Sequence, residues 1–264
     1  MWFLNILNKM EEKFLQVNGL KIFTRIAGEG SPFLILHGWG RGLTSWTHIQ
    51  DELSKHFKVV VLDLPGFGKS DVPKEVWNMD SYIQFILDFI KKININDFYL
   101  LGHSFGGNLA IKLSTQSPDK IRKLILVDSA GRRTKKSFSK KVFSLIVSIF
   151  KIFSFLPGYM FLKKSFYKFI LKSVDYIKAE GVMKDIFKRV VAEDLSEVWG
   201  KIELSTLIIW GKKDKVTPIE DAYLMKKGIK NSILRVFDCG HRVNNEKPEL
   251  LVKTILDFLC KNGN

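Results

Sequence analysis

Short runs of consecutive apolar residues recur along the chain and are separated by longer amphipathic segments. Such runs dominate residues 33–36, 58–62, 98–101, 124–127 and 206–210, and residues 233–237, which are interrupted by Arg235, are a further predicted strand. A run of this kind is typical of a strand that is buried on both faces of a parallel sheet. Between the runs, apolar residues recur at helical spacing, most clearly at 79–92. This alternation predicts an α/β protein with a mostly parallel sheet that is covered by helices on both faces.

The alternation changes at the beginning and in the middle of the chain. Residues 14–26 alternate between polar and apolar and are interrupted by Asn18-Gly19, which predicts a hairpin of two antiparallel strands. Residues 132–204 are helix-like and predict a helical cap that is inserted after the strand at 124–127. We therefore divide the 264 residues into a first core part (1–131), a cap (132–204) and a second core part (205–264).

The net charge of +15 is concentrated in the predicted cap. Residues 132–178 contain twelve Lys and Arg and a single acidic residue, Asp175. Their lysines alternate with apolar runs at 142–150 and 152–156, a pattern typical of amphipathic, lipid-facing or lid-like helices. We therefore expect no nucleic-acid partner and expect peripheral membrane or lipid contact through the basic cap. The alternative is a solvated basic face on ordinary helices.

Two apolar segments raise the question of membrane insertion. Residues 1–14 lack a basic region and a small-residue cleavage site, so we interpret them as a short amphipathic helix docked on the body. Residues 142–162 are long enough to cross a bilayer. However, Lys151 and Pro157-Gly158 interrupt this stretch and predict two shorter helices instead.

Neither a metal nor an organic cofactor is indicated by the sequence. Cys239 and Cys260 provide no disulfide framework and predict a reducing, cytoplasmic setting, and no Cys/His group has zinc-ligand spacing. The segment 66–70 ends like a phosphate-binding loop, but the first glycine of that motif would fall at Asp63. Similarly, Gly38-Trp39-Gly40 follows a strand, but the third glycine of a dinucleotide fingerprint would fall at Leu43.

Candidate chemistry begins at Gly102-His103-Ser104-Phe105-Gly106, between a predicted strand and a predicted helix. In this context the glycines allow a tight, strained turn that raises the Ser104 hydroxyl above the sheet edge. A serine needs a neighbouring base, and His241 follows the last predicted strand in a loop that can reach over the sheet. We expect structural roles for His103 and His37, and surface positions for His48 and His56.

The histidine in turn needs an acid, and the main candidates are Asp214 and Asp128, with Asp63 and Asp238 as further alternatives. Asp214 follows Trp210-Gly211-Lys212-Lys213 at the end of the penultimate predicted strand, which gives the chain order Ser, Asp, His. Asp128 ends the strand that follows the predicted nucleophile helix and is the rival. We prefer Asp214. The backbone N–H groups of Trp39 and Phe105 are the expected oxyanion donors.

These motifs, taken together, resemble the α/β-hydrolase superfamily over nearly the whole chain. The matching segments are His37-Gly38-Trp39-Gly40, residues 63–70, residues 102–107, residues 210–214 and Gly240-His241. The resemblance implies an eight-stranded sheet, a helical cap over the pocket, and Ser104, Asp214 and His241 as the catalytic triad. Arg242 departs from the family pattern, in which an apolar residue is common, and would place a cation at the mouth of the pocket.

The resemblance extends to small carboxylesterases and to hydrolases of carbon–carbon bonds in ring-cleavage products. Our first hypothesis is a serine hydrolase that cleaves an ester or thioester of a mainly apolar small molecule through an acyl-enzyme. Carbon–carbon bond hydrolysis of a diketone-type compound is the alternative within enzymes, and a non-catalytic binding module is the alternative outside them.

Overall fold

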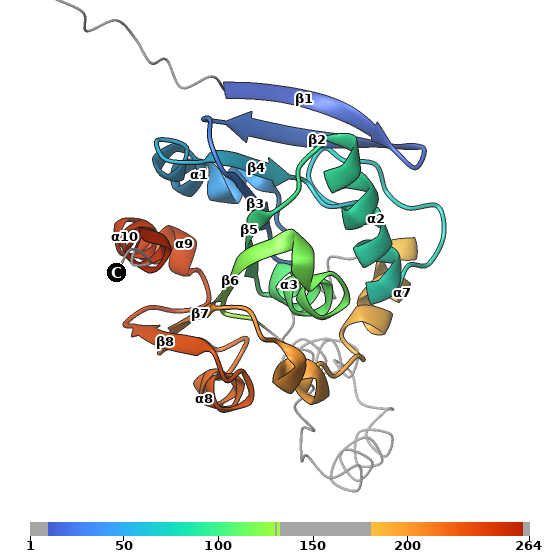
Figure 1. The fold of residues 1–264 in the computed structure, drawn as a ribbon. Helices are drawn as coiled ribbons and strands as arrows, with labels where there is room; N and C mark the ends of the chain where they lie inside the picture. The colour runs from blue at the N-terminus through green and yellow to red at the C-terminus, as the bar shows by residue number, and fades with distance from the viewer. Residues whose placement is uncertain (1–9, 130, 133–180, 261–264) are drawn as a thin grey trace, which may run out of the picture. The chain divides into compact units, whose positions relative to one another are not determined.

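The computed structural model describes residues 10–129, 131–132 and 181–260 (Figure 1). The chain divides into two compact units, one formed by residues 1–133 with 181–264 and the other by residues 134–180. The second unit, including the apolar stretch 142–162, lies outside the described residues. No helix in the described part of the chain is long and apolar enough to cross a membrane.

A single eight-stranded sheet organises the first unit, with the strand order β1-β2-β4-β3-β5-β6-β7-β8. The strands are β1 (Met10–Val17), β2 (Leu20–Ala27), β3 (Pro32–Leu36), β4 (Lys58–Leu62), β5 (Phe98–His103), β6 (Ile121–Val127), β7 (Thr206–Gly211) and β8 (Ser232–Phe237). Strand β2 pairs antiparallel with β1 and β4. The other neighbouring strands, β4, β3, β5, β6, β7 and β8 in spatial order, are parallel to one another. The predicted hairpin and the mostly parallel sheet are therefore confirmed.

Helices cover both faces of this sheet (Figure 1). One face carries α1 (Thr47–Leu53), which packs on α10 (Pro248–Cys260); the other carries α2 (Met79–Lys92), α3 (Phe105–Gln116) and α8 (Ile219–Gly228). The core between the sheet and the α1–α10 layer is built from buried apolar side chains such as Trp46, Ile125 and Ile255. Burial on both faces explains why the central strands read as unbroken apolar runs.

The N-terminal prediction of a helix is wrong for residues 10–14. These residues belong to β1, where Met10 pairs with Ala27 and Phe14 with Phe23. The Phe14 and Phe23 rings lie 5.1 Å apart between centroids. The ladder with β2 satisfies the backbone of this segment and its alternate side chains pack on the neighbouring strand, so pairing determines its conformation. Residues 1–9 lie outside the described residues.

Residues 181–204, which the sequence assigns to the cap, fall in the same compact unit as the sheet. They include α7 (Val182–Val190) and the 3-10 helix η3 (Ser196–Lys201), in which Trp199 is buried. A side chain at Gly228 of α8 would contact the Trp199 ring, so η3 is packed closely against α8. Helix α7 buries Met183, Ile186 and Val190 and exposes charged residues on its other side. This end of the predicted insertion therefore packs on α3 and α8, the helices that cover one face of the sheet.

Candidate active site

The turn between β5 and α3 holds Ser104 in an unusual backbone conformation. Ser104 has φ 52° and ψ −113°, a left-handed region that non-glycine residues rarely adopt. Its N–H donates to the carbonyl of Val127 (3.0 Å). A Cβ at Gly102 would collide with the Gly106 carbonyl, and one at Gly106 with the Leu36 carbonyl. Both glycines are therefore required for the strand, the turn and the helix to approach this closely.

The structure brings together the three residues that the sequence assigns to the triad. The Ser104 hydroxyl lies 3.1 Å from Nε2 of His241. On the other side of the ring, Nδ1 of His241 lies 2.7 Å from Oδ2 of Asp214. With the proton on Nδ1, the imidazole donates to the carboxylate and its Nε2 accepts from the serine.

The carboxylate of Asp214 is buried, whereas the His241 side chain is 18% exposed. Burial opposes the ionisation of Asp214, but hydrogen bonds from His241, the Thr217 hydroxyl and the Val216 N–H outweigh it and lower the pKa of the carboxyl. Thr217 donates from its hydroxyl to Oδ2 (2.6 Å) and from its N–H to Oδ1 (3.0 Å). Asp214 is thus kept ionised and held in one orientation toward the imidazole.

Thr217 is a site residue that sequence reasoning missed. Besides holding Asp214, its hydroxyl lies 3.3 Å from Nδ1 of His241. The Asx-type spacing of Asp214 and Thr217, three residues apart before a predicted helix, was the one available signal.

The rival acid, Asp128, has a different set of contacts. Its Oδ1 accepts the N–H of Gly211 at the end of β7 (2.8 Å). Its Oδ2 has no hydrogen-bond partner within the described residues and lies 3.9 Å from Nε2 of His103. Burial raises the pKa of Asp128 to about 7, against the hydrogen bond from Gly211. Asp128 therefore lies behind the histidine and anchors the strand end that precedes Asp214.

The remaining histidines agree with their predicted structural or surface positions. His103 donates from Nε2 to the His241 carbonyl (2.9 Å), and burial lowers its pKa to about 3. His37 accepts the Leu64 N–H at Nε2 (2.9 Å) and donates to the Gly38 carbonyl (2.8 Å). Burial lowers the pKa of His37 as well. His48 and His56 are exposed.

Asp63 ties the two loops that border the site. Its carboxylate accepts the N–H of Leu43 (2.6 Å) and the N–H of Lys69 (2.8 Å). A Cβ at Gly68 would collide with this carboxylate, so the loop can close on it only with glycine at that position. The segment 63–70 is therefore a structural clamp for the loop that follows β3.

The loop after β3 runs beside Ser104. A Cβ added to Gly38 would lie 3.3 Å from Cβ of Ser104, and the Trp39 and Phe105 rings lie 5.2 Å apart between centroids. Within the described part of the chain, the N–H groups of Trp39 and Phe105 donate no hydrogen bond. The first N–H groups of a helix, here of α3, have no partner within the helix. Two free donors are thus found on either side of the serine.

Aromatic side chains form one wall of the site. The Trp39 ring contacts Phe67 (4.8 Å between centroids) and Phe187 of α7 (5.0 Å). Tyr82 of α2 packs on Phe105 at 5.2 Å, edge to face. These rings, all of which are buried except that of the half-buried Phe187, form an apolar layer next to the nucleophile.

The described residues contain one group of ligand-type side chains near the site, and its contacts do not support a metal. His103, Asp128 and His241 bring potential ligand atoms within 4.8 Å of one another. However, Nε2 of His103 is bonded to the His241 carbonyl, and the His241 nitrogens face Ser104 and Asp214. A metal would have to displace these hydrogen bonds.

Comparison with known proteins agrees with the topology and the turn geometry. A family model described as the alpha/beta hydrolase fold matches residues 31–146. The chain has the α/β-hydrolase fold. The predicted fold class and family resemblance are therefore confirmed.

Curated proteins that are similar to this chain include hydrolases named for dienoic acid or dienedioate substrates. The chain is 25% identical over 279 residues to the 2-hydroxy-6-oxo-6-(2'-aminophenyl)hexa-2,4-dienoic acid hydrolase of Metapseudomonas resinovorans, with 96% of this chain and 92% of the relative covered. It is 26% identical over 284 residues to the 2-hydroxy-6-oxononadienedioate/2-hydroxy-6-oxononatrienedioate hydrolase 1 of Pseudomonas putida, with 96% of this chain and 98% of the relative covered.

Among solved structures, this chain resembles a membrane phospholipase A that is described as a novel bacterial virulence factor. The TM-score is 0.76 at 25% identity, and the match covers 96% of this chain and 87% of that chain.

Proposed function

We propose that this α/β hydrolase is a serine hydrolase that cleaves a carboxylic ester or thioester through an acyl-enzyme. The observation that carries the proposal is the continuous pair of contacts from Ser104 to His241 (3.1 Å) and from His241 to Asp214 (2.7 Å). In this arrangement His241 is the general base and Asp214 fixes its tautomer and stabilises the imidazolium.

The proposed reaction has two steps that share one proton carrier. In the first, Oγ of Ser104 bonds to the carbonyl carbon while its proton passes to Nε2 of His241. The leaving alcohol or thiol then departs with that proton, and the acyl group stays on Ser104. In the second, His241 takes a proton from water, the hydroxide attacks the acyl carbon, and Ser104 recovers its proton as the acid leaves.

The N–H groups of Trp39 and Phe105 are the proposed donors to the oxyanion of each intermediate. Their lack of an acceptor in the described residues and the closeness of the Gly38 loop to Ser104 support this role. Such a donor is worth about 10²–10³ in kcat. The aromatic wall around Trp39 supports an apolar acyl or aryl group in the substrate.

The proposal is tested with a serine-directed phosphonate probe and a series of 4-nitrophenyl esters of graded acyl length. We expect the wild type to be labelled once per chain and to hydrolyse at least one ester, and Ser104→Ala to do neither. Loss of the nucleophile typically costs on the order of 10⁶ in kcat. A folded wild type that the probe leaves unlabelled would instead favour a non-catalytic binding module.

Carbon–carbon bond hydrolysis is the second candidate, and the names of the two curated relatives favour it. Both of those proteins are named for dienoic acid or dienedioate substrates. The decisive comparison is between the ester series and a 2-hydroxy-6-oxo-dienoate, whose loss is followed by ultraviolet absorbance. Cleavage of the dienoate without turnover of any ester would reverse our preference.

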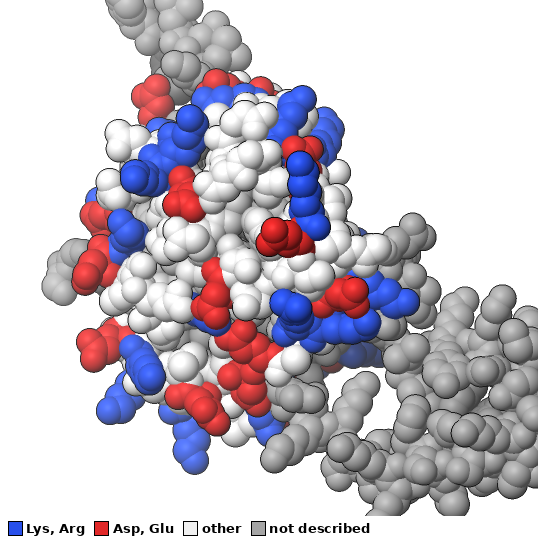
Figure 2. Space-filling model, turned by 90° about the vertical axis from the view of Figure 1, so that its right-hand side faces the viewer, with Lys and Arg blue, Asp and Glu red and all other residues white. Residues whose placement is uncertain are grey.

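Lipid contact through residues 132–178 is proposed on the basis of their charge. The segment has a net charge of +11, whereas Lys and Arg are interspersed with Asp and Glu over the face seen in Figure 2. We expect the full chain to sediment with vesicles that contain anionic lipid and to dissociate as salt is added. Equal sedimentation with neutral and anionic vesicles would contradict this expectation. A cytoplasmic location with peripheral membrane contact is part of the same proposal.

A further inference from the structure

Two loops beside Ser104 each carry an exposed arginine. Arg41 lies in the loop after β3, two residues beyond Trp39, and Arg242 directly follows His241. The side-chain amide of Asn244, in α9 (Val243–Glu246), donates to the carbonyl of Ser45 (2.7 Å) and ties the two loops together. The 3-10 helix η1 (Leu43–Trp46) also packs against α9. Both arginines are therefore presented at the edge of the sheet that holds the nucleophile.

Neither guanidinium makes an ion pair or a hydrogen bond with the described residues. The ion pairs of arginine among the described residues involve Arg25, Arg122 and Arg132. Asp63 lies close to the loop that carries Arg41, because its carboxylate accepts the N–H of Leu43. The same carboxylate also accepts the N–H of Lys69, so both of its oxygens already have a hydrogen-bond donor.

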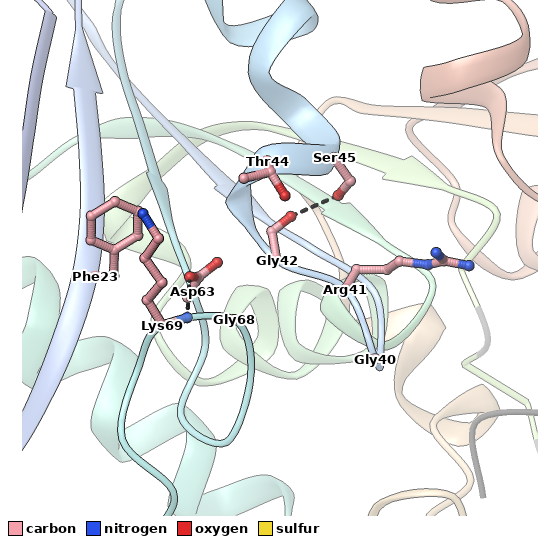
Figure 3. Close-up of a pocket in the computed structure, with 9 residues that line it drawn as sticks. All are labelled: Phe23, Gly40, Arg41, Gly42, Thr44, Ser45, Asp63, Gly68 and Lys69. Carbon is pink, nitrogen blue, oxygen red and sulfur yellow. Dashed lines mark hydrogen bonds between the residues drawn. The ribbon is translucent and has the colours of Figure 1, made fainter. Parts of the chain in front are cut away.

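Arg41 also borders an open space. A pocket of about 390 Å³ is lined by Gly40, Arg41, Thr44, Ser45, Asp63 and Lys69, among others. Figure 3 shows the Arg41 side chain extending away from Asp63, while Lys69 lies across the ring of Phe23 at the other end. The Lys69 ammonium is 4.3 Å from the centroid of that ring. Among the described residues, Arg41 is thus the cation in this pocket that makes neither an ion pair nor a cation–π contact.

The charge of Arg41 acts on the groups behind the triad. The pKa of His103 is lowered mainly by burial, and the positive charges of His241 and Arg41 lower it further. The rings of His103 and His241 lie 5.1 Å apart between centroids. A guanidinium in this position favours an anionic ligand, and its planar donors match the two oxygens of a carboxylate or a phosphate.

We propose that Arg41 and Arg242 form an anion-recognition site at the mouth of the active site, which selects substrates that carry a carboxylate or a phosphate close to the scissile bond. The inference rests on the proposed hydrolase function and deepens it. The substrate would then combine an apolar part, packed on the aromatic wall, with an anionic end.

The first test compares two esters that differ by one charge. Mono-4-nitrophenyl glutarate and 4-nitrophenyl pentanoate have acyl chains of the same length, and the former ends in a carboxylate. We expect Arg41→Gln and Arg242→Gln each to lower kcat/KM for the glutarate about 10- to 100-fold, mostly through KM, because each removes a charge-assisted hydrogen bond. For the pentanoate we expect less than about a two-fold change. The matched control is Arg235→Gln on β8, an exposed arginine at the far edge of the sheet.

The second test distinguishes a carboxylate from a lipid phosphate. Dihexanoylphosphatidylglycerol and dihexanoylglycerol are compared as dissolved monomers with the same variants. A selective loss on the phospholipid alone identifies the phosphate as the group recognised, and a selective loss on the glutarate alone identifies the carboxylate. Equal losses on charged and neutral substrates, or no loss on either charged substrate, would overturn the anion site.

A binding measurement separates this inference from the proposed function. In the Ser104→Ala background, monomethyl glutarate and methyl pentanoate are titrated and followed by ligand-observed NMR. We expect tighter binding of the glutarate and loss of that preference when Arg41→Gln and Arg242→Gln are added. An unlabelled wild type whose Ser104→Ala variant still shows the preference would refute the hydrolase and leave the anion site standing. A labelled wild type without the preference would refute the anion site alone.

Discussion

Asp214→Asn is expected to lower kcat for the best ester by about 10⁴, with a much smaller effect on KM. The amide of Asn has no negative charge to stabilise the imidazolium of His241. Its NH₂ group also donates to Nδ1 and so favours the opposite tautomer, in which Nε2 carries the proton and cannot take one from Ser104. The measurement is steady-state hydrolysis of the ester in wild type and variant. Circular dichroism and thermal unfolding establish that the variant remains folded.

Asp128→Asn is the matched control, because it changes the other carboxylate behind His241 in the same way. Asn keeps an oxygen that can accept the Gly211 N–H, so we expect kcat within about ten-fold of wild type. The opposite ranking, a large loss in Asp128→Asn and a small one in Asp214→Asn, would transfer the acid role to Asp128. Equal small losses would indicate that neither carboxylate orients the base.

The sheet could be predicted because its central strands are buried on both faces. Each reads as an apolar run, and the predicted helix at 79–92 has the same bounds as α2. Strand β6 was predicted from residue 124 but begins at Ile121, because Arg122 and Lys123 interrupt the run. The Lys123 ammonium donates to the Phe258 carbonyl (3.0 Å) at the end of α10, a tertiary contact that local sequence does not reveal.

The candidate triad could be predicted because the turn, the strand ends and the chain order constrain its members. The positions of Ser104, Asp214 and His241 at the carboxyl ends of parallel strands imply that they meet at one sheet edge. The supporting contacts could not be predicted in the same way. Thr217 and Asp128 contribute through hydrogen bonds that depend on the distance between β6 and β7 and on the path of the loop after β7. Only the packed chain specifies these distances.

The free energy of unfolding is expected to fall by about 1.4 kcal/mol per pH unit, through Asp128, as the pH rises from about 4 to about 7. Burial raises the folded-state pKa of Asp128 from an ordinary value of 3.8 to about 7, so the folded protein binds more protons than the unfolded chain in this window. Stability from this proton is fully present below pH 4 and is lost as the pH passes through the folded-state pKa. Asp128→Asn removes this titration, so the stability of the variant relative to that of the wild type should rise with pH across this window.

Urea unfolding at a series of pH values measures this difference, and the stability of Asp128→Asn minus that of wild type should rise by about 4 kcal/mol between pH 4 and pH 7.5. Taking the difference cancels the titration of the other carboxylates and of the histidines. Asp257→Asn, which removes an exposed carboxylate from α10, is the matched control and should give a nearly flat difference. A flat difference for Asp128→Asn would mean that its carboxylate is stabilised in the folded protein by water or by His103. In that case the acid behind the triad would be charged at neutral pH, and its negative charge would compete with Asp214 for the imidazolium that forms on His241.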